Sequence, residues 1–109
     1  MASDAGGARS TDAAEPVPLI RNISTELVGS ALVMVAGPGA IVLSGGAISD
    51  LGVAMTFGVA MALSIAVIGA VANPMFTLAL MLVREISPRD ALGDWTGQLL
   101  GAVIGGALI

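Results

Sequence analysis

The chain has 109 residues, of which 56% are hydrophobic and only 11% are charged, and its formal net charge is −4. A soluble domain carries roughly 25% charged residues, so the composition excludes an ordinary soluble domain, while the high apolar content excludes a fully disordered chain. Cysteine, histidine, tyrosine and lysine are absent. We therefore expect no metal site, no cofactor, no nucleic-acid binding and no enzyme activity.

Residues 1–21 are predicted to form a disordered polar leader. Ala, Gly, Ser, Asp and Pro dominate this segment, and Pro16 and Pro18 break any helix before Leu19. Residues 22–109 form the second predicted unit, an all-α membrane domain. Its charges leave three uncharged stretches between them, because they fall only at Glu26, at Asp50 and within 84–94.

The first and last uncharged stretches predict two membrane helices. Residues 27–49 are long enough to cross a hydrocarbon core of about 30 Å at 1.5 Å per residue, which predicts a helix over about 23–44. Residues 95–109 would form about 22 Å of helix, which is short of a full span. Together with the helix-start signal at Pro88, they predict a helix over about 89–109.

The middle uncharged stretch, 51–83, is too long for one crossing and too short for two. It divides at Asn73-Pro74, because asparagine is a preferred N-cap and proline a preferred first helical residue. The division predicts a helix over about 51–70 and a half-helix over about 74–84, which is about half the bilayer thickness. The alternative is that the dipeptide only kinks one long helix or marks a loop.

A half-helix that ends at Arg84 and Glu85 places Asn73 near the bilayer midplane. Non-helical backbone is tolerated at that depth only against protein or a water-filled cavity, because unpaired N–H groups cost several kcal/mol each in hydrocarbon. A helix N-terminus facing a cavity repels cations, and the Asn73 amide offers hydrogen-bond donors to a passing oxygen. Such a site suits neutral hydrogen-bonding solutes.

Small residues are spread through the predicted spans. The regular part is Gly97, Gly101 and Gly105, at four-residue spacing in the last helix. In lipid, small residues at this spacing allow helix backbones to approach closely. We therefore expect a tightly packed helical bundle.

Several motifs resemble the aquaporin or major intrinsic protein family. Asn-Pro-Met-Phe-Thr at 73–77 stands where the family has Asn-Pro-Ala followed by Val-Thr. Four further stretches agree with the family's helices, at 25–30, 37–40, 52–60 and 94–102. The resemblance implies half of an aquaporin-like inverted-repeat fold, the N-terminal repeat, with three membrane helices and one re-entrant half-helix.

The resemblance also implies a function and a set of site residues. The function is a passive transmembrane channel, or half-channel, for water or small neutral solutes. The implied pore motif is Asn73, Pro74 and Met75, with Asn73 donating hydrogen bonds to the solute. Phe57 is the implied selectivity constriction and favours water over glycerol, and Glu26 and Gln98 are the implied buried polar supports. The implied partners are a second repeat and, by family resemblance, a homo-tetramer in the lipid bilayer.

Two departures from the family bear on transport. Only three residues separate Gly69 from Asn73, where the family has about seven, so the connection is predicted to be strained or the preceding helix to end deeper. Met75 replaces the alanine of the family motif and puts a long, flexible side chain beside the narrowest part of the pore. We expect it to restrict flow.

The distribution of arginine predicts the orientation. Under the family topology all four arginines lie on one side, so the positive-inside rule places the N-terminus in the cytoplasm of a multi-pass cell-membrane protein. Two copies in one orientation cannot form an inverted pair. With the short last helix, this favours an incomplete copy of a longer channel, or a half that needs an oppositely oriented partner.

Two other functions stay open. A small proton-coupled multidrug exporter would use Glu26, since a lone carboxylate within the membrane is by default a functional candidate. A non-conducting structural module would use the helices only for packing.

Overall fold

The computed structural model describes residues 16–109, and this part of the chain is helical with no strand. Most of the predicted leader, residues 1–15, lies outside the described residues. The first helix begins at Leu19 rather than at about 23, so it includes the end of the predicted leader. The elements in chain order are α1 (Leu19–Ser44), α2 (Asp50–Leu63), the π-helix η1 (Ser64–Ile68), α3 (Pro74–Leu82) and α4 (Pro88–Ala107).

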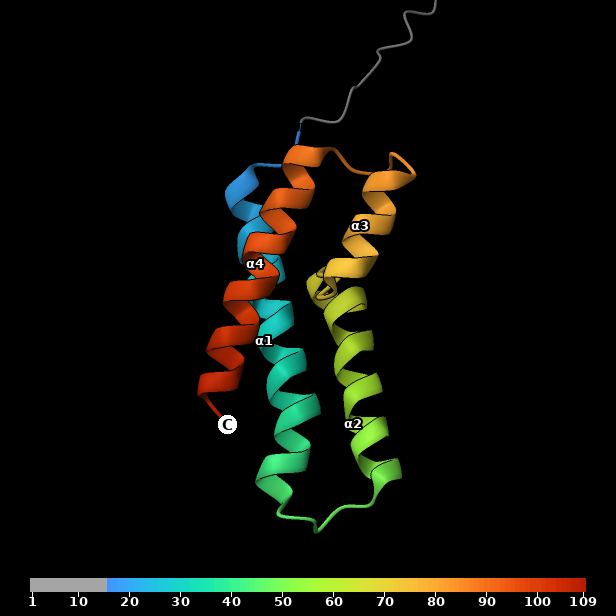
Figure 1. Cartoon of the computed structure of the whole chain (residues 1–109), viewed down its shortest axis with the longest axis vertical. Helices are drawn as coiled ribbons and strands as arrows, with labels where there is room; N and C mark the ends of the chain where they lie inside the picture. The colour runs from blue at the N-terminus through green and yellow to red at the C-terminus, as the bar shows by residue number, and fades with distance from the viewer. Residues whose placement is uncertain (1–15) are drawn as a thin grey trace, which may run out of the picture.

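The long α1, the α2–η1 rod, α4 and the much shorter α3 form the bundle (Figure 1). α1 and the continuous α2–η1 run antiparallel and are joined by the link at 45–49. The start of α1, the end of α3 and the start of α4 lie together at the opposite end of the molecule, and α3 occupies only the half nearest that end. The arginines Arg21, Arg84 and Arg89 consequently all lie toward one end.

Polar side chains define where the helices begin. Ser49 caps α2 by accepting a hydrogen bond from the Gly52 amide at 3.2 Å. Ser87 caps α4 by accepting one from the Asp90 amide at 3.1 Å, and its hydroxyl donates to the Asp90 carboxylate at 2.7 Å. Both caps satisfy amides that the first helical turn leaves without a partner.

α1 and α4 pack with their backbones in close approach, as the glycine spacing predicts. A side-chain carbon added at a glycine of α4 would collide with a backbone carbonyl oxygen of α1. The pairs are Gly97 with Ile23, Gly101 with Leu27 and Gly105 with Ala31. Because the spacing of four is the same on both helices, the two run parallel and in register. The predicted close packing of this part of the bundle is confirmed.

Large apolar side chains point mostly outward. The apolar residues buried in the described part are small or branched, namely Val33, Ala60, Ala70 and Ala91, while Leu51 and Val67 are more than two-thirds exposed. Exposing so many apolar side chains is unfavourable in water, but it suits the hydrocarbon of a lipid bilayer.

Two helices are long and apolar enough to cross a membrane. They are α1, which contains an 18-residue stretch of mean hydropathy 2.0, and the rod Asp50–Ile68, which contains one of mean hydropathy 2.3. Neither is mostly buried within the described bundle. α4 does not meet the same criterion, since Arg89, Asp90 and Asp94 lie in its first two turns and its many glycines lower its hydropathy.

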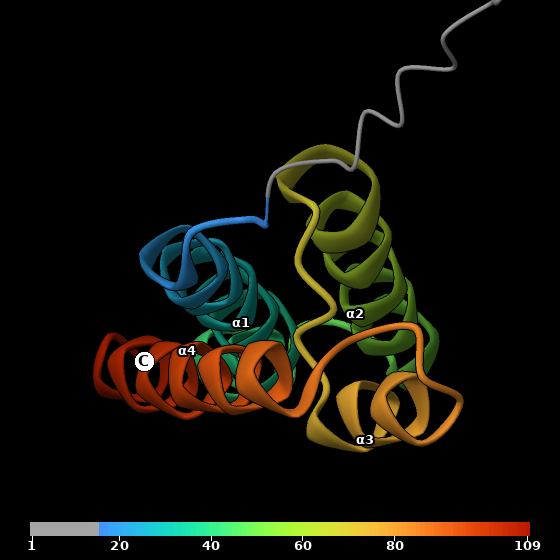
Figure 2. The ribbon, with the colours of Figure 1, turned by 90° about the horizontal axis from the view of Figure 1, so that it is seen from above.

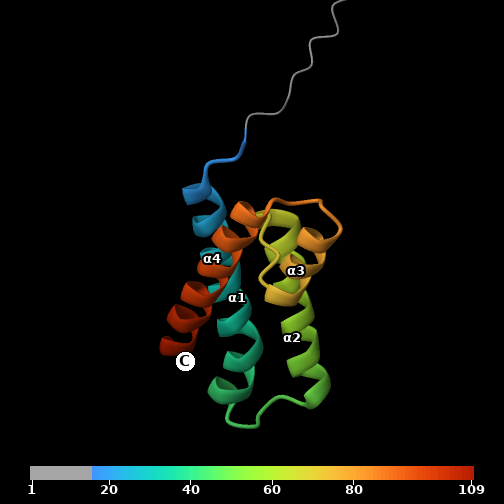
Figure 3. The same cartoon turned by 45° about the horizontal axis from the view of Figure 1, so that its top comes forward.

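Residues 69–73 connect η1 to α3 across the bundle. Seen from above, the segment passes alongside α1 before α3 begins (Figure 2), and the tilted view shows η1 behind α3 (Figure 3). Gly69 ends η1 with φ of 80°, and Ala72 adopts φ of 50°. The left-handed conformation costs a residue with a Cβ about 1–2 kcal/mol, so other contacts must hold Ala72 there.

Candidate functional site

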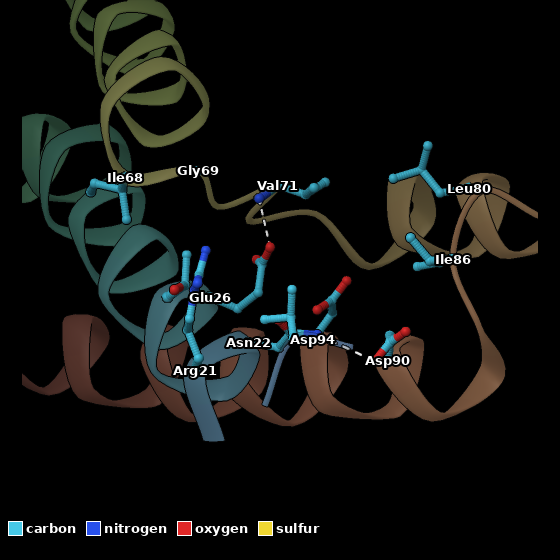
Figure 4. A pocket seen from close by; sticks show the side chains of 12 residues that line it. Arg21, Asn22, Glu26, Ile68, Gly69, Val71, Leu80, Ile86, Asp90 and Asp94 are labelled. Atoms are coloured by element: carbon cyan, nitrogen blue, oxygen red, sulfur yellow. Dashed lines mark hydrogen bonds between the residues drawn. The ribbon is translucent and has the colours of Figure 1, made fainter. Parts of the chain in front are cut away.

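The Glu26 carboxylate holds the connection before α3. Its Oε1 accepts a hydrogen bond from the Val71 amide at 2.7 Å, and its Oε2 accepts one from the Ala72 amide at 2.8 Å. The bond to Val71 is drawn in Figure 4. A charged acceptor strengthens both bonds, which offset the strain of the left-handed Ala72. Glu26 therefore acts across the bundle, from α1 onto the segment that leads to Asn73.

Gln98 links this carboxylate to α3. Its Nε2 donates to Glu26 Oε2 at 3.1 Å and to the Thr77 hydroxyl at 2.9 Å. All three side chains are 3% exposed or less. A buried polar network of this kind stabilises one arrangement, because a partner lost from it leaves an unpaired group in an apolar setting. It joins α1, α3, α4 and the connecting segment at one place.

Asn73 caps α3, which begins at Pro74. The Asn73 Oδ1 accepts hydrogen bonds from the Met75 amide at 3.0 Å and from the Phe76 amide at 3.3 Å. Because the amide is planar, this geometry directs the Nδ2 amino group away from the helix, and the residue is exposed. Asn73 therefore presents two N–H donors at the head of α3, beside the end of the helix dipole that carries partial positive charge.

Phe57 and Pro74 line one cavity. Its volume is about 230 Å³, and Ala72 and Gln98 also contribute to its wall. The Phe57 ring lies directly over Gly37, where any side chain would collide with it. Glycine in α1 thus makes room for the aromatic ring of α2. The structure brings three of the predicted site residues, Phe57, Pro74 and Gln98, to one cavity wall.

Asn73 and Met75 lie differently from these. Asn73 contributes to a separate cavity of about 200 Å³, with Met61 and Ile65 from the α2–η1 rod and Phe76 from α3. The Met75 side chain is 72% exposed and is not part of the wall of either cavity.

A larger cavity, of about 440 Å³, opens at the end of the molecule where α1 begins. Arg21, Glu26, Asp90 and Asp94 supply its charged lining, and Gly69 and Val71 border it from the connecting segment (Figure 4). Its polar wall lies on the arginine-bearing end of the bundle. The cavity borders the segment 69–73 on the side where Glu26 binds it.

Three side chains matter to this geometry although the sequence predictions did not assign them a role. Thr77 accepts from Gln98, Ser64 donates from its hydroxyl to the Ala70 carbonyl at 3.2 Å, and Trp95 donates from its indole to the Pro74 carbonyl at 3.0 Å. Thr77 and Trp95 stand inside motifs that resemble the family. Ser64 could have been noticed as a polar residue within an apolar stretch.

The short connection is accommodated by the end of the preceding helix. The last turn of that rod widens into the π-helix η1, whose Ser64 carbonyl accepts from the Ala70 amide at 3.0 Å. This backbone bond and the Ser64 hydroxyl bond run in opposite senses between the same two residues. The widened turn and the left-handed residues Gly69 and Ala72 together allow three residues to make the connection.

A family model described as major intrinsic protein matches residues 13–109. The chain belongs to the major intrinsic protein family. It is 37% identical over 94 residues to the lens fiber major intrinsic protein of Gallus gallus, a match that covers 82% of this chain and 36% of that protein.

A bacterial relative is more distant. The chain is 28% identical over 94 residues to glycerol uptake facilitator protein-like 6 of Lactiplantibacillus plantarum (strain ATCC BAA-793 / NCIMB 8826 / WCFS1), a match that covers 83% of this chain and 43% of that protein. No solved structure matches the chain. The chain thus spans less than half the length of these two curated relatives.

Family membership confirms the resemblance that the motifs indicated. The helices of residues 16–109 are those of an all-α half of the major intrinsic protein fold. At the level of the family, this is a membrane protein, and two of its helices are apolar and long enough to cross a bilayer.

Proposed function

We propose that this chain supplies one half of a passive channel for water or small neutral solutes. The observation that carries the proposal is the head of α3, where Asn73 turns its two N–H donors outward while its Oδ1 is held by the helix. A donor pair of this kind can order a solute oxygen without a charge. The helix N-terminus beside it disfavours cations.

The support network makes this site rigid. Glu26 holds the backbone before Asn73, and Gln98 joins the carboxylate to Thr77 in α3. In the proposed role, Glu26 and Gln98 are supports that do not touch the solute. Phe57, which lines the neighbouring cavity together with Pro74, is the proposed constriction, and Pro74 and Met75 complete the proposed pore motif.

The proposed setting is a cell membrane, with the arginine-bearing end in the cytoplasm. The proposed partner is a second repeat, in the same longer protein or in a separate chain, because the relatives are more than twice the matched length. A homo-tetramer is proposed on family resemblance. The glycerol named for the bacterial relative makes a small polyol the natural second solute to test alongside water.

An osmotic shrinkage assay in proteoliposomes tests the proposal. Reconstitution from detergent inserts copies in both orientations, so two oppositely oriented copies can supply both repeats in the same vesicle. We expect such vesicles to shrink faster than empty vesicles under an osmotic step, and Asn73→Ala to reduce the difference at least severalfold. The matched control is Asn22→Ala, the other asparagine of the chain, which loses only a long 3.5 Å hydrogen bond to Asp90 at the arginine-bearing end and should leave the flow unchanged. Flow equal to that of empty vesicles would contradict channel function for this chain.

A further inference from the structure

α3 is a short helix with few neighbours. It has nine residues, whereas isolated helices of fewer than about 12–15 residues are marginal even in favourable sequences. Among residues 16–109, α4 is the one helix that packs directly against it. A cavity lined by Met61, Ile65 and Phe76 lies between α3 and the α2–η1 rod. Besides the Glu26 bonds to the segment before it, the position of Asn73 therefore depends on the contacts that α4 makes with α3.

Two side chains of α4 reach α3. Gln98 donates to Thr77, and this bond belongs to the Glu26 network described above. Trp95 lies one turn earlier in α4 and donates from its indole Nε1 to the Pro74 carbonyl at 3.0 Å. The second bond is independent of the carboxylate, and it reaches the first residue of α3.

The peptide unit between Pro74 and Met75 is held at both ends. Its carbonyl accepts from Trp95, while its N–H, the amide of Met75, donates to Asn73 Oδ1 at 3.0 Å. A peptide bond is planar and trans, so its C=O and N–H point in opposite directions from one rigid plate. The shorter of the two hydrogen bonds that hold the Asn73 amide therefore comes from a peptide plane whose other edge is bound by the indole.

We propose that Trp95 is a positioning residue for the solute-facing Asn73 side chain, acting through the Pro74–Met75 peptide plane. Without the indole N–H, the plane can tilt, and the Asn73 amide tilts with it. The indole does not touch the solute. The inference deepens the proposed function, on which it rests for the meaning of the Asn73 donors, but its geometry can be tested without any flow.

The test is hydrogen exchange on the whole chain in lipid nanodiscs, read at single residues by NMR. The variant is Trp95→Phe, which keeps an aromatic ring and removes the N–H. Loss of one net hydrogen bond should speed exchange of the Met75 and Phe76 amides about fivefold. Amides of α1 and α2 should exchange as in the unsubstituted chain. Thr96→Val is the control, because Thr96 is the next residue of α4, is exposed and bonds only within α4 at Leu92.

A second measurement needs no change at Trp95. Trp95 is the only tryptophan in the chain, so its indole N–H gives a single resonance. Asn73→Ala should shift this resonance and speed its exchange, while Asn22→Ala should not. Unchanged exchange at Met75 and Phe76 in Trp95→Phe would overturn the proposal, as would equal acceleration in α1, α2 and α3. If the exchange results are as expected and the vesicles shrink no faster than empty ones, the positioning role stands and the channel function falls.

Discussion

The two sides of this small bundle are held together by different means. On one side, α1 and α4 meet through glycines, and backbone lies against backbone at Gly97, Gly101 and Gly105. On the other side, α3 and the connection at 69–73 are held by hydrogen bonds from Glu26, Gln98 and Trp95. The first interface is made by shape, and the second by a few directed bonds beside cavities.

The difference indicates where a solute site can lie in such a fold. In lipid, close packing of small residues gives an interface that tolerates no added volume and presents no hydrogen-bonding side chains to a solute. The other side presents polar groups, because its backbone leaves the helix and its N–H and C=O groups need side chains as hydrogen-bond partners. A site for a polar solute therefore belongs to the loosely packed side, and the tightly packed side serves as its frame.

We expect the largest effect from a variant that disrupts the packing of α1 against α4. In Gly101→Leu the new side chain collides with the Leu27 carbonyl of α1, which cannot move without moving its helix. We expect the free energy of unfolding to fall by about 3 kcal/mol, near the upper end for overpacking. Unfolding by SDS in mixed micelles, followed by circular dichroism, measures it. Gly106→Leu is the control, since nothing lies within 4 Å of that position. Equal stability of the two variants would show that α1 and α4 do not meet as described.

The next effect breaks the polar side. Glu26→Gln keeps one oxygen but sets an amino group against the Val71 or Ala72 amide and removes the charge from both bonds. The expected loss is about 2 kcal/mol of unfolding free energy, by the same SDS titration. Glu85→Gln, at an exposed position in the turn after α3, is the matched control and should change little.

The same variant separates the channel from the exporter hypothesis. In an exporter, binding of a cationic drug would release a proton from Glu26, and Glu26→Gln would abolish this release. In the structure the carboxylate accepts three hydrogen bonds from Val71, Ala72 and Gln98. We therefore expect no drug-linked proton release from the unsubstituted chain, measured with a pH indicator in weakly buffered micelles. Release that disappears in Glu26→Gln would favour the exporter.

The sequence predicts features that depend on neighbouring residues better than features that depend on distant ones. The start of α3 at Pro74 is a local signal, because an asparagine cap and a first-turn proline need only their own neighbours. The contact faces of Gly97, Gly101 and Gly105 follow from their spacing alone. These features depend on few residues, close together in the chain.

The remaining features depend on distant partners. Trp95 and Pro74 are 21 residues apart, and Glu26 and Val71 are 45 apart. No local pattern states that Ala72 adopts a left-handed conformation, since alanine ordinarily avoids it and only the Glu26 bond makes it acceptable. The π-helix η1 likewise follows from the need to reach Asn73 in a few residues. The resemblance to the family implied Glu26 and Gln98 as buried supports, but it implied nothing about the indole bond of Trp95.

A smaller effect sharpens the comparison at the end of η1. Ser64→Ala removes the hydroxyl bond to the Ala70 carbonyl and leaves that carbonyl with one partner fewer in a fully buried place. We expect a loss of about 1 kcal/mol. Ser44→Ala is the control, because its hydroxyl makes only a long 3.4 Å bond within α1. If Ser64→Ala proves as stable as Ser44→Ala, η1 is held by backbone bonds alone.

The smallest effect on stability tests the pore motif itself. The Met75 side chain is 72% exposed, so Met75→Ala should change the free energy of unfolding by less than about 0.5 kcal/mol. Its effect on flow should be larger, because a long, flexible side chain next to Asn73 obstructs a solute that approaches the amide. We expect faster osmotic shrinkage of vesicles than with the unsubstituted chain. Met55→Ala, in α2 and 60% exposed, is the control and should leave the flow unchanged. If both variants conduct as the unsubstituted chain does, Met75 lies outside the path of the solute, and the proposed pore motif reduces to Asn73 and Pro74.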